Sequence, residues 1–81
     1  MTTDALSSNA LIYAILALNS EIALQKDYLD SGEVPEDELD NEQDLQDDLE
    51  QAFMEFIDLY KKRLASDAEL PSVEELLNSE L

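Results

Sequence analysis

Residues 36–50, with the sequence EDELDNEQDLQDDLE, carry nine carboxylates and no Lys, Arg or His. Clustered Asp and Glu side chains are the residue types that bind Ca²⁺ or that act as a paired acid and base. An EF-hand loop starting at Asp40 would place Leu45 where the loop needs Gly, and Gln51 where it needs a bidentate Glu. The segment therefore predicts only diffuse binding of divalent cations and no specific calcium site.

Other catalytic chemistry has few candidate residues in this chain. The sequence contains no His and no Cys, so it lacks the commonest general base, the commonest transition-metal ligand and any thiolate zinc site. Its three tyrosines, Tyr13, Tyr28 and Tyr60, occupy apolar helical positions that favour packing over catalysis. A small helical hairpin also offers no cleft across which two carboxylates can act. We therefore expect no enzymatic activity, no cofactor and no metal site.

Length and charge define the class of protein. The chain has 81 residues, 21 of them acidic and 4 basic, with a formal net charge of −17. We treat residues 1–81 as one small domain. Such a charge repels nucleic acid and anionic membranes and attracts basic protein surfaces. The apolar run at 10–18 is shorter than the roughly 20 residues that span a bilayer and lacks the basic flank of a secretory signal. We expect a soluble cytoplasmic protein that binds neither nucleic acid nor membranes directly.

Turn and capping residues predict an all-α fold. Gly32 with Pro35 forms one break in the helical pattern, and Pro71 forms a second. Asp4 or Ser8 is a candidate N-cap for the first helix, which Gly32 should end. The breaks predict helices at about 5–30, 36–65 and 72–80. The first two helices should form an antiparallel hairpin, followed by the short third helix.

The third helix should begin with a capping box formed by Ser72 and Glu75. A helix of this length is unstable alone in water, so it must pack against its own chain or enter another protein's groove.

The second helix separates apolar and acidic residues cleanly. Its apolar face runs from Leu45 to Leu64, and its opposite face is rich in carboxylates. Glu38 and Glu42 lie on the apolar side ahead of Leu45, which predicts that this end overhangs the first helix. The candidate acidic interaction face consists of Glu36, Asp37, Asp40, Asp44, Asp47, Asp48 and Glu55.

The first half of the first helix is apolar on nearly every side, which indicates burial on several sides. Since the second helix covers only one side and the third is short, we expect a homodimer in which two hairpins form a four-helix bundle. A monomer with the third helix folded across the first is the competing arrangement. The candidate dimer interface consists of Leu11, Ile12, Ile15, Leu16, Leu18 and Ile22.

These features favour a small adaptor or regulatory protein that acts through protein–protein interaction. The alternative is a nucleic-acid mimic, or an inhibitor of the antitoxin or immunity type, that covers a basic protein surface with the acidic face. A structural oligomer without an outside partner is a third class. A solvated acidic face, as in a halophilic protein, would need no partner at all.

Overall fold

The computed structural model describes residues 6–79, which form three α-helices and one short 3-10 turn. The predicted all-α class is confirmed, and the described residues contain no strand. No helix in this part of the chain is long and apolar enough to cross a membrane. The elements are α1 (Ser8–Asp30), the turn η1 (Glu36–Glu38), α2 (Leu39–Ser66) and α3 (Val73–Ser79).

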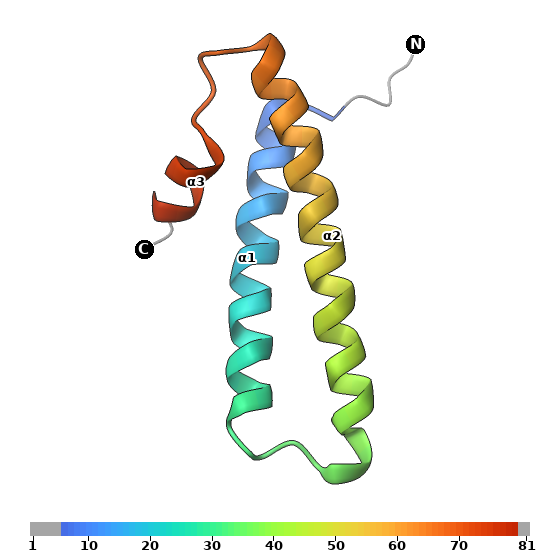
Figure 1. Ribbon diagram of the computed structural model, residues 1–81. Coiled ribbons are helices and arrows are strands. Elements are labelled where there is room, and N and C mark those ends of the chain that lie inside the picture. Colours follow the sequence, from blue (N-terminus) through green and yellow to red (C-terminus); the bar gives the residue numbers. More distant parts are fainter. Residues whose placement is uncertain (1–5, 80–81) are drawn as a thin grey trace.

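The two long helices lie side by side and antiparallel, and the loop between them closes one end of the hairpin (Figure 1). Helix α1 begins at Ser8 because Ser7 caps it, its hydroxyl accepting from the Ala10 N–H at 3.0 Å. The predicted cap Ser8 is wrong, because Ser8 is the first residue of the helix, and the other predicted cap, Asp4, lies outside the described residues. Gly32, at φ 77°, follows the end of α1 as predicted, in a conformation that glycine adopts without strain.

The α-helical part of the second segment begins at Leu39, three residues after the predicted start. Residues 36–38 form the 3-10 turn instead, in which the Glu38 N–H donates to the Pro35 carbonyl oxygen at 2.9 Å. Proline fixes its own φ and has no N–H to donate, so Pro35 suits the residue just before the turn. The acidic segment therefore changes from 3-10 to α geometry within its first few residues.

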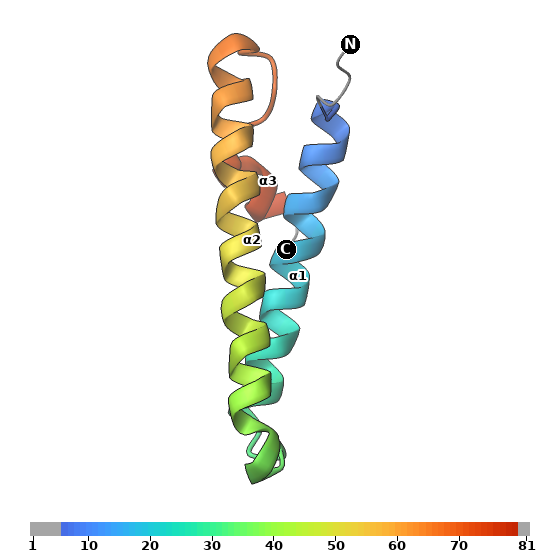
Figure 2. The same ribbon diagram turned by 90° about the vertical axis from the view of Figure 1, so that its right-hand side faces the viewer.

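Helix α3 folds back along the half of the hairpin that holds the start of α1 and the end of α2 (Figures 1 and 2). The predicted capping box is confirmed: the Ser72 N–H donates to the Glu75 carboxylate at 2.8 Å, and the Glu75 N–H donates to the Ser72 hydroxyl at 3.1 Å. Leu76 is buried and Leu77 is half-buried against the same core. The third helix thus packs against its own chain.

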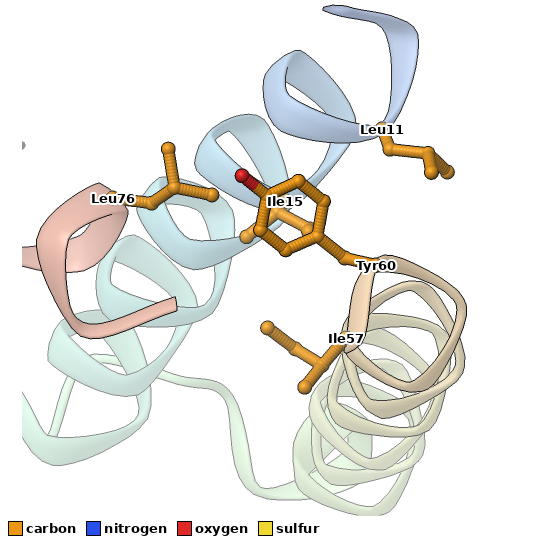
Figure 3. Close-up of a cluster of buried hydrophobic side chains, with 5 residues drawn as sticks. All are labelled: Leu11, Ile15, Ile57, Tyr60 and Leu76. Carbon is orange, nitrogen blue, oxygen red and sulfur yellow. The ribbon is translucent and has the colours of Figure 1, made fainter. Parts of the chain in front are cut away.

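The buried hydrophobic side chains converge at one place in the molecule, between all three helices (Figure 3). Half-buried neighbours such as Phe53, Phe56 and Leu64 pack around them at the same end of the hairpin. The buried cluster consists of Leu11 and Ile15 from α1, Ile57 and Tyr60 from α2, and Leu76 from α3.

A second contact holds this end together. The Arg63 guanidinium, in the last turn of α2, donates to the Leu6 carbonyl oxygen at 2.7 Å and to the Ser8 hydroxyl at 3.2 Å. The arginine therefore joins the end of α2 to the start of α1, opposite the covalent loop.

The candidate dimer-interface residues are distributed unevenly. Leu11 and Ile15 are 1% and 0% exposed within a single chain, because α2 and α3 cover them. Ile12 and Leu16 are half-buried against the same cluster. Leu18 and Ile22 are half-buried further along α1. One chain therefore covers much of the face that the sequence assigned to a second copy.

Candidate functional site

The acidic face begins in the 3-10 turn and continues along α2. Glu36 and Asp37 lie in the turn, and the five other candidate carboxylates lie on the helix; all seven are exposed. At about 100° per residue, the five on α2 fall within an arc of about 100°, on the side away from the core residues Phe53 and Tyr60. Helical periodicity therefore gathers these carboxylates on one side of a rod. The five are Asp40, Asp44, Asp47, Asp48 and Glu55.

No basic side chain lies in the sequence of this region. Residues 27–60 contain fourteen carboxylates and neither Lys nor Arg. Lys26 precedes the segment on α1, while Lys61, Lys62 and Arg63 follow it in the last turns of α2. Because Arg63 bonds to the start of α1, its charge lies at the opposite end of the hairpin from the loop. The loop end of the molecule is therefore strongly negative.

Among residues 6–79, glutamine is the only side-chain hydrogen-bond partner of the acidic face. Gln51 Nε2 donates to the Glu55 carboxylate at 3.3 Å, and Gln43 Nε2 is 3.5 Å from the Asp47 carboxylate. Both bonds run along one exposed helix face and leave the charge of the carboxylates in water. Within residues 6–79 no three acidic side chains converge closely enough to hold a metal ion. The geometry suits long-range attraction of a cationic surface.

Beneath this face, the two long helices meet through polar side chains. Gln25 on α1 donates from Nε2 to the Glu42 carbonyl oxygen at 3.0 Å and to the Glu42 carboxylate at 2.8 Å. Glu42 is half-buried and bonded across the hairpin, so the predicted overhang of this residue is wrong. Glu38, by contrast, is exposed in the 3-10 turn.

Gln46 is the buried polar residue of this half of the hairpin, with 5% of its surface exposed. Its Nε2 donates to the Glu50 carboxylate at 3.0 Å, but its Oε1 is buried without a hydrogen-bond partner among the described residues. Sequence reasoning missed this residue, although its helical position matches that of Phe53 one heptad later. Helical periodicity thus placed position 46 on the buried face, but its polar side chain argued against burial.

Replacing Gln46 with leucine should raise the free energy of unfolding by about 1 kcal/mol, because a buried acceptor without a donor is costly and Glu50 can bond to water instead. Chemical denaturation at a fixed protein concentration measures the change. Gln51→Leu is the matched control: this exposed glutamine also bonds to a glutamate four residues on, and its loss should change stability little. A destabilised Gln46→Leu variant would show that the Oε1 has a donor.

Comparisons of the chain with protein-family models, with curated proteins and with solved structures found no match.

Proposed function

We propose that this protein acts through protein–protein interaction, as a small adaptor or regulatory protein whose acidic face binds a basic surface of its partner. The observation that carries the proposal is the position of the carboxylates. All seven candidates are exposed, the five on α2 lie on one side of that helix, and residues 27–60 supply no cation to neutralise them. Exposed charge of one sign speeds association with an oppositely charged partner and selects against acidic ones.

The cost of the arrangement supports a role beyond solubility. On a regular α-helix, residues four apart are neighbours, so the pairs Asp40–Asp44 and Asp44–Asp48 repel one another. Neither carboxylate pair is relieved by an intervening Lys or Arg, which would be the simplest way to gain stability. A basic partner would remove this repulsion on binding.

A more specific form of the proposal is mimicry of nucleic-acid charge. Four carboxylates of the acidic face fall within residues 40–48, a helical length of about 13 Å, or about one charge per 3–4 Å. One strand of duplex DNA carries a charge about every 3.4 Å along the axis. The similar linear charge density favours a partner that normally binds nucleic acid, and it makes this protein an inhibitor of that partner.

A variant with Asp40, Asp44, Asp47 and Asp48 changed to Asn tests both forms. In pull-downs from nuclease-treated source lysate, wild type should capture a basic protein that elutes as salt rises, because salt screens exposed charges. The neutralised variant should bind that protein at least about tenfold more weakly. Its melting temperature should rise, because like-charge neighbours are removed.

The matched control neutralises four exposed carboxylates away from the acidic face: Asp27 and Asp30 to Asn, and Glu69 and Glu74 to Gln. Both variants raise the net charge of −17 by four, so only the position of the charge differs. Equal binding by the two variants would contradict a role for this face. If the protein mimics nucleic acid, duplex DNA should displace it from the captured partner. If the partner's basic site does not bind nucleic acid, the complex should survive added DNA.

A further inference from the structure

The outer face of α1 carries large hydrophobic residues that the described part of the chain leaves exposed. Tyr13 is 70% exposed and Leu24 63%, although both are large hydrophobic residues. Tyr28 is 37% exposed and Leu6, just ahead of the helix, is 45% exposed. Ala10 and Ala17, both exposed, fall on the same side of the helix. We call these six residues the outer seam.

The spacing of the outer seam is that of a helix–helix contact. Residues 6, 10, 13, 17 and 24 follow steps of four and three, with Ser20 at the one intervening position. At about 100° per residue, the outer seam lies about 150° around α1 from Leu11 and Ile15, which face α2 and α3. Residues 6–79 therefore leave this side of α1 uncovered.

Charge identifies what can cover the outer seam. Between residues 5 and 20 the chain has no charged residue, and Glu21 is the only charged residue on the line of the outer seam. The exposed side of α2 is acidic, so a copy with the same charge of −17 meets less repulsion at the outer seam than along α2. An antiparallel approach also places the two acidic loop ends at opposite ends of the pair, along molecules 46 Å long.

The sizes of the side chains fit the same arrangement about Ala17. Ala10 and Leu24 each lie seven residues from Ala17, or about 10 Å along the helix, so each leucine meets an alanine. Tyr13 lies four residues before Ala17 and Glu21 four residues after it, so each tyrosine hydroxyl meets a carboxylate acceptor. Leu6 and Tyr28 likewise pair at the two ends. Ala17 meets its own copy at the centre, where a small residue permits close approach.

We propose that two copies of this chain associate through the outer seam as an antiparallel dimer with its twofold axis at Ala17. The four long helices then form a layer in the order α2, α1, α1, α2, and each α3 keeps its place on its own hairpin. The dimer is independent of the proposed function, because its contacts lie on α1 and the acidic face lies on α2.

Cysteine crosslinking tests both the dimer and its direction, since the described chain has no free cysteine to interfere. In a glutathione buffer, Ala17→Cys should form a disulfide-linked dimer rapidly, because the two positions meet at the axis. Ala10→Cys should not, since its two copies would lie about 21 Å apart along the helix. Ala23→Cys, also exposed but away from the outer seam, is the control for random collision.

Each result decides the question. Slow crosslinking of Ala17→Cys, at the rate of Ala23→Cys, would overturn the dimer, and equal crosslinking of Ala10→Cys would overturn the antiparallel direction. Sedimentation gives an independent readout: wild type should run at twice the 9.1 kDa chain mass, and Leu24→Glu should raise the dissociation constant at least about tenfold. A wild-type monomer at about 100 μM protein, in salt that reduces the Debye length to about 4 Å, would also overturn the proposal.

Discussion

Replacing Ile15 with alanine should lower the free energy of unfolding by about 2–5 kcal/mol. Ile15 is 0% exposed and lies where side chains from α1, α2 and α3 converge (Figure 3). Its truncation therefore removes buried apolar contacts with both other helices. A domain of this size has a total stability of only about 5–10 kcal/mol. The variant should therefore lose a large share of its stability and melt at a clearly lower temperature.

Met54→Ala is the matched control, because it removes a side chain of similar size that is 55% exposed on α2. We expect that change to cost less than about 1 kcal/mol. Urea denaturation followed by circular dichroism, with both variants at the same protein concentration, measures the difference. Equal losses would show that burial is spread along the hairpin and not concentrated at the end that carries α3.

Replacing Tyr60 with phenylalanine should lower the free energy of unfolding by about 1–3 kcal/mol and loosen α3. The ring of Tyr60 is 0% exposed, and its hydroxyl donates to the Pro71 carbonyl oxygen at 2.6 Å, just ahead of α3. Phenylalanine keeps the ring and deletes only this bond. Because a helix of seven residues is unstable alone, weaker anchoring should show as faster amide exchange at residues 73–79.

The Tyr60 hydroxyl also gives this variant a distinct dependence on pH. Burial raises the pKa of Tyr60, and the nearby charges of Glu75 and Asp67 raise it further. The unfolded chain releases this proton near pH 10, while the folded chain retains it. The contribution to stability is therefore complete below about pH 10 and is lost as the pH rises through the folded-state pKa.

Tyr60→Phe should accordingly lose part of the alkaline decline in stability that wild type shows. Tyr28→Phe is the control, because Tyr28 is exposed and lies outside the buried cluster that contains Tyr60. A Tyr60→Phe variant with wild-type stability and an unchanged alkaline profile would contradict the role assigned to this hydrogen bond.

Local signals made the helices predictable. The capping box of Ser72 and Glu75 sets the start of the third helix, and Gly32 follows the end of the first. Both signals involve only residues close together in the sequence, and the structure confirms both. The exposure of Asp40 and Asp47 likewise follows from helical periodicity alone.

What the sequence did not reveal depends on how the helices align with one another. The bond from Gln25 to Glu42 joins residues seventeen positions apart and exists only in one register of α1 against α2. The partner of the Tyr60 hydroxyl, the Pro71 carbonyl oxygen, is a backbone atom with no side-chain signal. The interface candidates Leu11 and Ile15 were assigned to a second copy because the coverage that α2 and α3 provide together cannot be read from periodicity.

Because the buried side chains are concentrated at one end of the hairpin, the two ends of the molecule tolerate substitutions to different extents. Substitutions near Ile15 and Tyr60 are limited by shape, since each displaces several packed neighbours. Substitutions on the exposed side of residues 39–50 meet no such limit, because water is their main neighbour. New surface features can therefore accumulate at the loop end, while the opposite end, fixed by packing, keeps the fold.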